Sequence, residues 1–288
     1  MIPLIDVSYC RLTTSDLAGA ERFCLEVLGL DVSERRKGAV HFKSDHRDHT
    51  LVYCEGDPAN SGEQVLGIEI TDATALDGAA ATLEGMGIAV RRGTAAEAEE
   101  RHVKDFIAFQ DLTGNALELV LRPATTGRRY HGSRDAGITG FSHVGLYTKN
   151  PERDEAFWTE VLGARVSDRI GDAPLMRLGP IHHSIALFPA QRSGIQHINH
   201  QVESTDDIQR AASMLRARGV DITFGPGRHP TSSAQFLYFS GPDGLTYEYS
   251  TGVREIHDEP AWHNRQFPFA PLGFCQWGSK PNIPAFKD

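Results

Sequence analysis

PGRHPTSSAQFLYFSGPDGLTYEYS, residues 226–250, reads as two strands joined by a tight turn. Aromatic and β-branched residues predict strands over 236–239 and 245–250, and the Gly-Pro-Asp-Gly sequence at 241–244 predicts the turn between them. Alternate residues of a strand share a face, so Glu248 points away from the tyrosines on either side of it. A carboxylate in this apolar setting is costly unless a partner or a metal stabilises it; the alternative is a solvated glutamate on an edge strand.

Length, charge and cysteine content limit the class of protein. With 288 residues and 40% hydrophobic content, the chain can bury one large core or two ordinary ones. A formal net charge of −9 disfavours nucleic acid and anionic membrane surfaces as partners. The sequence has no apolar run of bilayer length, no basic start typical of a signal peptide and no paired cysteine spacing. We therefore expect a soluble cytoplasmic protein with free thiols.

The second half of the chain repeats the first. ERFCLEVLGLDV at 21–32 aligns with EAFWTEVLGARV at 155–166. Both segments are predicted to be amphipathic helices that end at their glycine, with Ser15 and Asn150 as the respective N-caps. An internal repeat of this length predicts two domains of one fold.

Each half is expected to contain two units of a strand, a helix and several strands, which is an α+β fold built from βαβββ modules. The predicted strands are 5–12, a pair within 41–54, 65–70, 89–92, 106–109, 116–121, 141–147, 175–178, 183–188, 196–202 and 222–224, besides the two in the opening segment. The predicted helices are 16–28, 73–86, 152–162 and 206–218. The predicted divisions are a first domain at 1–126, a linker at 127–138, a second domain at 139–254 and a tail at 255–288.

Polar residues distinguish the two halves. The aligned pairs are His143 with Tyr9, His197 with Val65, and Glu248 with Glu118. Because the first half builds the same fold without those histidines, packing does not require them. Two imidazoles and one carboxylate can occupy one face of a metal ion and leave the opposite positions open, which suits non-haem Fe(II) oxygen chemistry better than zinc chemistry. His197 and His200 are three apart in a strand, so both cannot reach one metal.

A longer motif surrounds these residues in the second half. It consists of Gly227-Arg228-His229, Leu237-Tyr238, the turn Gly241-Pro242-Asp243-Gly244, and Glu248. The motif resembles the signature of the type I extradiol ring-cleaving dioxygenases, which belong to the vicinal oxygen chelate superfamily, and the resemblance extends over both halves. Gly241 departs from the Asp, Glu, Asn, Thr or Ala usual in that family; a glycine is conformationally acceptable in a turn, so activity is still expected.

The resemblance implies roles for the histidines and the glutamate. The implied iron ligands are His143, His197 and Glu248, with His197 preferred to His200. The implied acid–base catalyst is His183, which precedes a Ser-aliphatic-Ala strand. Its neighbour His182 is the alternative and otherwise a solvated edge residue.

Residues near the substrate follow from the same resemblance. His229 and Tyr238 match the pair that hydrogen-bonds the substrate hydroxyls, and Thr231 is a further candidate for substrate contact. His49 aligns with His183 but has no predicted metal ligand beside it, so a structural role is expected. The resemblance also implies an open, barrel-like mixed sheet around a funnel in each domain, with the tail covering the site.

The implied function is extradiol cleavage of a catechol, in which both atoms of O2 enter the ring and a hydroxymuconic semialdehyde-type product forms. Single-ring catechols, including 3-substituted ones, and biphenyl-type catechols are the candidate substrates. Fe(II) is the expected cofactor, with Mn(II) as the alternative, and a homo-oligomer is expected. The rival functions are a glyoxalase-like metal-dependent isomerase or transferase and a metal-free binding protein of the same superfamily. The isomerases and transferases lack the group formed by His183, His229 and Tyr238, and the retained two histidines and glutamate argue against a metal-free binding protein.

Overall fold

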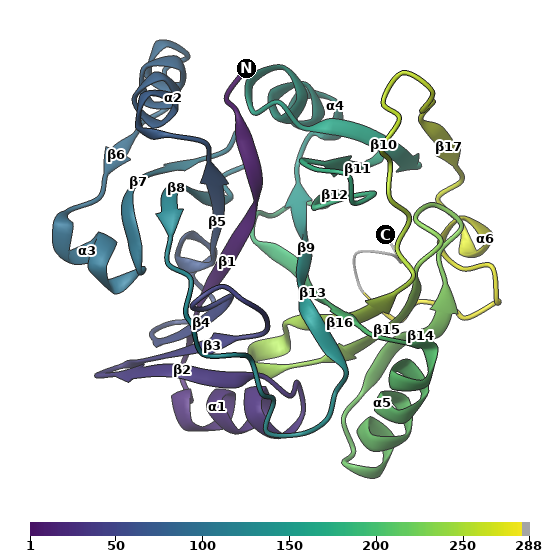
Figure 1. The fold of residues 1–288 in the computed structure, drawn as a ribbon. Coiled ribbons are helices and arrows are strands. Elements are labelled where there is room, and N and C mark those ends of the chain that lie inside the picture. Colours follow the sequence, from purple (N-terminus) through teal and green to yellow (C-terminus); the bar gives the residue numbers. More distant parts are fainter. Residues whose placement is uncertain (284–288) are drawn as a thin grey trace.

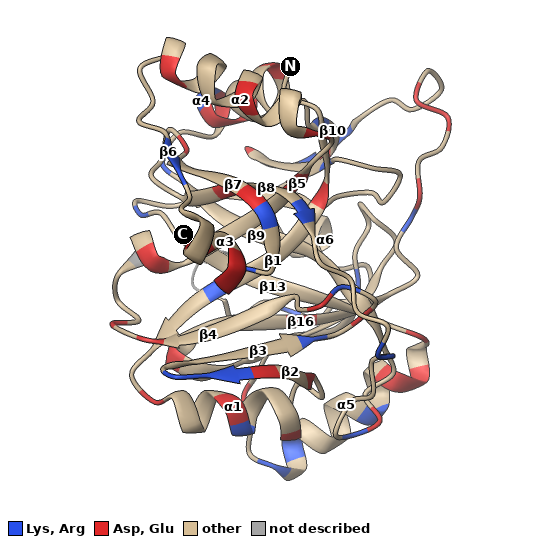
Figure 2. Ribbon diagram, turned by 60° about the vertical axis from the view of Figure 1, so that its left-hand side comes forward, with Lys and Arg blue, Asp and Glu red and all other residues tan. Residues whose placement is uncertain are grey.

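Two mixed sheets, one from each half of the chain, lie side by side in the computed structural model (Figure 1). The structure describes residues 1–283. None of the helices in that range is long and apolar enough to cross a membrane. Figure 2 shows charged residues of both signs along β2 and on the outer helices, at the periphery of the sheets.

The first sheet has eight strands in the order β2-β3-β4-β1-β5-β8-β7-β6. Its strands are β1 (Leu4–Thr14), β2 (Asp31–Arg36), β3 (Ala39–Lys43), β4 (Leu51–Glu55), β5 (Val65–Ile70), β6 (Arg91–Arg92), β7 (Val103–Gln110) and β8 (Ala116–Pro123). Its helices are α1 (Leu17–Glu26), α2 (Ala73–Gly85) and α3 (Ala95–Glu100), with a short 3₁₀ turn η1 (Ser61–Glu63).

The second sheet has nine strands in the order β14-β15-β16-β13-β9-β12-β11-β10-β17. Its strands are β9 (Ile138–Thr148), β10 (Arg165–Ile170), β11 (Ala173–Arg177), β12 (Ile185–Pro189), β13 (Ile195–Val202), β14 (Ile222–Arg228), β15 (Gln235–Ser240), β16 (Thr246–Thr251) and β17 (Arg265–Phe267). Its helical segments are α4 (Pro151–Ala156), η2 (Phe157–Val161), α5 (Thr205–Ala217), η3 (Pro242–Gly244) and α6 (Pro271–Phe274).

Strand pairing shows the modular repeat. In the first sheet β1 pairs parallel with β4, β5 pairs parallel with β8, and an antiparallel β1–β5 pair joins the two modules. The second sheet repeats this pattern with β9 and β12, β13 and β16, and the antiparallel β9–β13 pair. The prediction of an α+β fold with two βαβββ modules in each half is therefore confirmed.

Several local predictions need correction. Asp16, not Ser15, caps α1, because its carboxylate accepts a hydrogen bond of 2.8 Å from the backbone N–H of Gly19. Asn150 caps α4 as predicted, but that helix ends at Ala156 and continues as a π-helical turn, η2. The strand predicted from residue 183 begins only at Ile185, so the two adjacent histidines lie in the loop before it.

The tail adds a strand to the second sheet and buries apolar side chains. Its strand β17 extends the second sheet by pairing parallel with β10. Phe274, Cys275 and Ile283 are buried in an apolar cluster with residues of β9, β12, β14 and β15. The tail is thus a packed part of the second half, on the side of the sheet that carries the site described next.

Candidate metal centre and active site

Three central strands and a hairpin strand bring the predicted site residues to one face of the second sheet. The register pairs Asn199 of β13 with His143 of β9 and with Glu248 of β16, and pairs Glu248 with Tyr238 of β15. Cross-strand partners project from the same face, and His197 is two residues from Asn199 in the same strand. The side chains of His143, His197, Tyr238 and Glu248 therefore share a face.

The three predicted ligands offer donor atoms at distances that suit one metal ion. Nε2 of His143 is 3.0 Å from Nε2 of His197 and 2.9 Å from Oε2 of Glu248, and Nε2 of His197 is 3.4 Å from the same oxygen. Donors bonded to one ion at about 2.1 Å, with angles of roughly 90–110°, lie about 3.0–3.4 Å apart. The residues present therefore fit a divalent metal.

Burial strengthens that fit. His143 is 3% exposed, and His197 and Glu248 are each 1% exposed. Neither carboxylate oxygen of Glu248 has a hydrogen bond of acceptable geometry among the described residues, although Nε2 of His143 is close. The donor atoms of the three residues thus converge on one buried place. A solvated glutamate on an edge strand is ruled out, because β16 lies between β15 and β13.

Electrostatics favours the metal-binding protonation states. Burial raises the pKa of Glu248, but the neighbouring His143, His229 and His197 imidazoles lower it more, so its pKa falls well below the ordinary range. Burial lowers the pKa of His197 to about 3. An ionised carboxylate and a neutral imidazole are the forms that bind metals. The Oε1 atom of Gln196 also contacts Nδ1 of His197, which orients the ring and leaves Nε2 as the donor toward the centre.

His200 faces the other side of β13. It pairs with Phe141 in the register, and the two rings lie 6.0 Å apart between centroids. Neither of its ring nitrogens has a hydrogen-bond partner among the described residues. His200 is therefore separated from the metal donors as strand alternation predicts.

Of the two adjacent histidines, His183 lies against the predicted ligands. Its ring centroid is 4.2 Å from that of His143. Its pKa is lowered well below the ordinary value, first by burial and then by the neighbouring His143 and His182. His182 is fully buried, which contradicts its interpretation as a solvated edge residue.

A carboxylate fixes the protonation pattern of this histidine pair. Nε2 of His182 is 2.9 Å from Oδ2 of Asp168, and Nδ1 of His182 is 3.1 Å from Nδ1 of His183. A neutral His182 must carry its proton on Nε2 to donate to the carboxylate, so its Nδ1 accepts from Nδ1–H of His183. This leaves Nε2 of His183 with a free lone pair. The hydrogen bonds from Asp168 through His182 thus leave Nε2 of His183 able to accept a proton.

The second predicted pair, His229 and Tyr238, is held by the tail. Nδ1 of His229 is 2.8 Å from the carbonyl oxygen of Phe274, so this nitrogen carries the proton and donates. Nε2 of His229 can then accept from the hydroxyl of Tyr238 at 3.2 Å, and it lies 3.5 Å from Oε1 of Glu248. Burial and the charge of Glu248 raise the pKa of Tyr238 well above 10, so the phenol stays neutral.

Thr231 contacts the tail through its backbone. It is buried in the loop before β15, and its carbonyl oxygen accepts a hydrogen bond of 2.6 Å from Arg265 of the tail. The hydrogen bond made by the Thr231 backbone is therefore with Arg265 of the tail.

Sequence reasoning missed the residues that support the site. Asp168 binds His182 and also accepts from Arg265 at 2.6 Å, so a strand and the tail meet at one carboxylate. Asp168 lies in a mostly polar strand that the apolar pattern did not reveal. Its alignment with Glu34 of the first half was the signal that could have located it.

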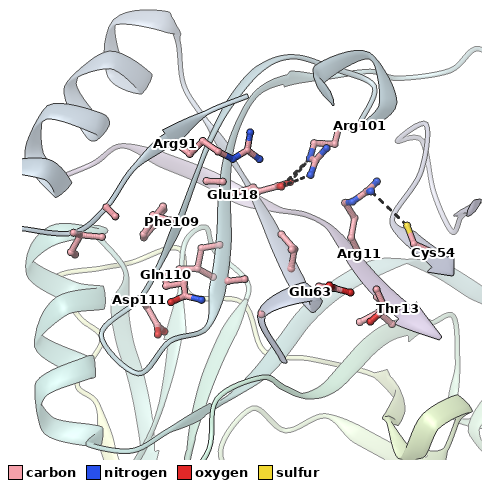
Figure 3. A pocket seen from close by; sticks show the side chains of 18 of the residues that line it. Arg11, Thr13, Cys54, Glu63, Arg91, Arg101, Phe109, Gln110, Asp111 and Glu118 are labelled. Carbon is pink, nitrogen blue, oxygen red and sulfur yellow. Dashed lines mark hydrogen bonds and ion pairs between the residues drawn. The ribbon is translucent and has the colours of Figure 1, made fainter. Parts of the chain in front are cut away.

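The first half fills the equivalent position with an ion pair. The hydroxyl of Tyr9 donates to Oε2 of Glu118 at 2.5 Å, and a guanidinium nitrogen of Arg101 lies 2.8 Å from Oε1. These groups satisfy the carboxylate that corresponds to Glu248. A cavity of about 770 Å³ lies beside Arg101 and Glu118, with Arg11 and Phe109 also lining it (Figure 3).

Comparison with known proteins yields a consistent set of matches. The family model described as "Glyoxalase/Bleomycin resistance protein/Dioxygenase superfamily" matches residues 6–119 and 140–249. An iron-dependent extradiol dioxygenase of Rhodococcus jostii (strain RHA1) is 28% identical over 281 residues, covering 90% of this chain and 93% of the relative. A biphenyl-2,3-diol 1,2-dioxygenase of Paraburkholderia xenovorans (strain LB400) is 28% identical over 285 residues, covering 88% and 93%.

Solved structures show the same fold over nearly the whole chain. The crystal structure of BphC, a halotolerant catechol dioxygenase, superposes with a TM-score of 0.87 at 24% identity, covering 99% of this chain and 97% of that one. The Mn(II)-bound glyoxalase from Novosphingobium aromaticivorans also gives a TM-score of 0.87, at 25% identity, covering 99% and 94%.

Proposed function

Because the chain belongs to the glyoxalase/bleomycin resistance protein/dioxygenase superfamily, we propose that it is an extradiol dioxygenase that inserts both atoms of O2 into a catechol. The observation that carries this proposal is the convergence, on one buried face, of a two-histidine, one-carboxylate donor set with His183, His229 and Tyr238. The relatives named extradiol and biphenyl-2,3-diol dioxygenases, matched over most of their length, support the same reaction class.

We propose Fe(II) as the resident metal, held by His143, His197 and Glu248, with Mn(II) as the alternative. A facial set of two imidazoles and one carboxylate suits oxygen-activating iron, because it leaves positions for both substrate oxygens and O2. When bound, the ion would supply Lewis acidity toward the catechol hydroxyls and an electron path to O2.

The chain's own residues would move and hold protons. Nε2 of His183 carries the free lone pair and can accept a proton from a catechol hydroxyl and later return it. The hydroxyl of Tyr238 and the imidazole of His229 can hydrogen-bond the substrate oxygens, and the neutral Tyr238 remains a donor at physiological pH. The buried aromatic residues of the tail and strands would keep bulk water out.

The proposed reaction also limits the substrate and the product. We propose a single-ring, 3-substituted or biphenyl-type catechol as substrate and a hydroxymuconic semialdehyde-type product. The apolar cluster that contains Tyr238 also includes Tyr147, Phe188, Phe224 and Phe274, which suits contact with a flat apolar ring. The proposed divisions are domains at 1–126 and 139–254, a linker at 127–138, and a covering tail at 255–288, of which 284–288 lie outside the described residues.

To test the proposal, the protein is first loaded with Fe(II) or Mn(II) in the absence of oxygen, and its turnover is then measured. Catechol, 3-methylcatechol, 2,3-dihydroxybiphenyl and homoprotocatechuate are then offered with O2, and the yellow ring-opened product is measured. Oxygen uptake equal to product formed supports the proposal. Glu118→Gln serves as the matched control for Glu248→Gln, because it removes the aligned carboxylate of the other half.

A glyoxalase-like isomerase is the second candidate, favoured by the likeness to the Mn(II)-bound glyoxalase. Isomerisation of a thiol–aldehyde adduct without oxygen uptake, and no cleavage of any catechol, would support it instead. We also propose a homo-oligomer in the cytoplasm, which light scattering of the purified protein and cell fractionation would test.

A further inference from the structure

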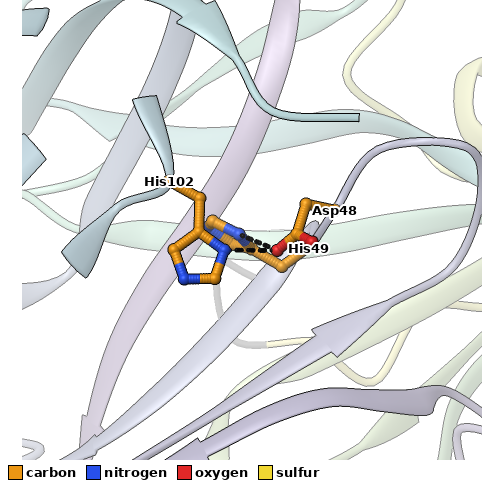
Figure 4. A group of neighbouring side chains, drawn as sticks. All are labelled: Asp48, His49 and His102. Atoms are coloured by element: carbon orange, nitrogen blue, oxygen red, sulfur yellow. Dashed lines mark hydrogen bonds and ion pairs between the residues drawn. The ribbon is translucent and has the colours of Figure 1, made fainter. Parts of the chain in front are cut away.

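A second cluster of potential metal ligands lies in the first half of the chain (Figure 4). Asp48 and His49 come from the loop between β3 and β4, and His102 comes from the turn between α3 and β7. Their donor atoms lie within 4.8 Å of one another. We propose that these three residues bind a divalent transition-metal ion of the zinc type, separate from the proposed catalytic metal.

The donor atoms are arranged around one carboxylate oxygen. Oδ2 of Asp48 is 2.5 Å from Nδ1 of His102 and 3.6 Å from Nδ1 of His49. Donors bonded tetrahedrally to zinc at about 2.0–2.2 Å lie about 3.3–3.6 Å apart. The Asp48–His49 distance already fits an ion, and the Asp48–His102 distance needs to open by about 1 Å. Binding an ion would therefore require the side chains of Asp48 and His102 to move apart.

His49 is buried with poorly satisfied ring nitrogens, and unlike His200 it faces a carboxylate and a second histidine. Its side chain is 3% exposed, yet neither ring nitrogen has a hydrogen bond of acceptable geometry among the described residues, and Oδ2 of Asp48 stands 3.6 Å from Nδ1. A buried polar group without a partner carries a desolvation cost that a bound ion would offset.

His102 is already oriented as metal-binding histidines are. While Nδ1 faces Asp48, Nε2 lies 2.9 Å from Oε2 of Glu34, and a carboxylate on the far nitrogen is the usual support of a metal-bound imidazole. Arg36 pairs with the same oxygen at 2.6 Å and lies 3.0 Å from Nε2 of His102. Without metal, that nitrogen can accept from Arg36; with metal on Nδ1, it donates to Glu34.

The repeat places this cluster at the counterpart of the catalytic histidine network. Glu34 aligns with Asp168, Asp48 with His182, and His49 with His183. The first half thus has a carboxylate, Glu34, where the second has Asp168, and a histidine, His49, where the second has His183. It has Asp48 in place of His182, and His102 joins from another turn. Two nitrogens and one oxygen make a donor set common to zinc, with further positions left for water. The alignment alone gave His49 a structural role because His102 is distant in sequence.

Metal counting in the full-length chain tests the proposal. The double variant His143→Ala/Glu248→Ala removes the proposed catalytic ligands, and the metal-free protein is titrated with Co²⁺ and Zn²⁺. We expect one equivalent to remain bound, with the visible absorption of Co²⁺ in a low-coordinate nitrogen–oxygen site. Adding His102→Asn should abolish that equivalent; asparagine is chosen because residue 102 has a φ of 50°, which asparagine tolerates.

The matched control is His46→Asn, which removes a histidine whose side chain is 80% exposed beside the cluster and should leave binding unchanged. Glu34→Gln should weaken Co²⁺ binding by about 10–100-fold, since it removes only the supporting carboxylate. Circular dichroism checks that each variant is folded. If the double variant retains no Co²⁺ or Zn²⁺, or if Glu34→Gln and Asp48→Asn leave the affinity unchanged, the proposal is wrong. Failure of the catalytic proposal would appear separately, as catechol inactivity of the unmodified protein.

Discussion

Hydrogen bonds among the buried side chains of Glu248, His143 and His197 cannot use all of their facing lone pairs. Both Nε2 atoms face Oε2 of the carboxylate, and they also face each other at 3.0 Å. If both imidazoles are neutral and Nδ1 of His197 carries that ring's proton, only Nε2 of His143 can carry a proton among the three facing atoms. At least one buried lone pair then has no hydrogen-bond donor. A divalent cation removes this conflict, because it accepts all three lone pairs at once.

The first prediction follows from that arrangement. Glu248→Ala and His197→Ala should each lose the bound metal after dialysis, because two remaining donors do not hold an ion in competition with water. His200→Leu should keep full metal content, since its ring lies on the opposite side of β13. Metal content per chain, measured by atomic spectroscopy, checks this. Full occupancy in His197→Ala would contradict the ligand assignment.

His200 also leads to a pH prediction. Burial lowers its pKa to about 3, against an ordinary value of about 6.5, so the folded protein holds the ring neutral. As pH falls from 6.5 toward 3, the unfolded chain binds the proton first, and the stability present above pH 6.5 is lost. His200→Leu removes this loss. Between pH 8 and pH 5, the unfolding free energy of the parent should fall by about 2 kcal/mol more than that of His200→Leu. Urea unfolding at both pH values measures the difference; an identical pH dependence in the two proteins would argue against it.

A third prediction separates the proton carrier from its support. His183→Phe should keep the metal but lose about 10²–10⁴-fold in turnover, the usual range for removing proton transfer. Asp168→Asn should also keep the metal, lose activity by about 10-fold and shift the pH profile of kcat, because the tautomer of His182 is no longer fixed. The matched control is Asp172→Asn, an exposed neighbour on the β10–β11 turn. An unchanged pH profile in Asp168→Asn would show that the carboxylate is only structural.

At the scale of elements, a glycine in β9 makes room for one ligand. A Cβ added at Gly145 would lie 2.4 Å from Nδ1 of His197 and 2.8 Å from Oε1 of Gln196. Contacts this short force the His197 ring and its supporting amide to move. The small size of residue 145 is thus part of the site, although the residue has no chemistry of its own.

The fourth prediction tests this. Gly145→Ala should fold but bind Fe(II) or Co²⁺ about 10-fold or more weakly, because the displaced imidazole no longer meets the ion at a good angle. Gly78→Ala, in helix α2 with no atom within 4 Å of the added Cβ, should leave the affinity unchanged and stabilise the protein by about 0.5–1 kcal/mol. Equal metal affinity of the parent and Gly145→Ala would mean that the neighbouring side chains adapt freely.

The elements also show where prediction from the sequence succeeds. The hairpin of β15 and β16 was predicted to within a residue or two, because its aromatic residues flank a glycine–proline turn. Strands β2 and β10 were missed, because DVSERR and RVSDRI are mostly polar and owe their place in the sheets to neighbouring strands. The missed β10 carries Asp168, so the support of His182 was missed with it.

At the scale of the whole molecule, the repeat was the most informative signal. It predicted two halves of one fold and indicated that the second-half histidines are not needed for packing. Contacts between segments distant in sequence could not be predicted in this way. His102 reaching Asp48, and the tail carbonyl of Phe274 reaching His229, depend on tertiary packing that leaves no local pattern in the sequence.

The two halves pack through one continuous core. Buried residues of both, among them Leu28 and Tyr53 from the first half and Trp158 and Tyr247 from the second, form a single apolar cluster. The hydroxyls of Tyr53 and Tyr247 lie 2.7 Å apart inside it, and Tyr249 of β16 donates to the carbonyl oxygen of Leu28 at 2.7 Å. A shared core of this kind favours unfolding of both halves in one transition.

The last prediction measures the link between the halves. Tyr53→Phe or Tyr247→Phe alone leaves the other hydroxyl buried without its partner, which should cost about 1–3 kcal/mol of unfolding free energy. The double variant Tyr53→Phe/Tyr247→Phe removes both polar groups, so its loss should be smaller than the sum of the single losses. Urea unfolding of the four proteins gives the coupling energy directly. Additive losses would mean that the hydroxyls do not interact, and two separate transitions in the parent would mean that the halves are joined less tightly than their common core requires.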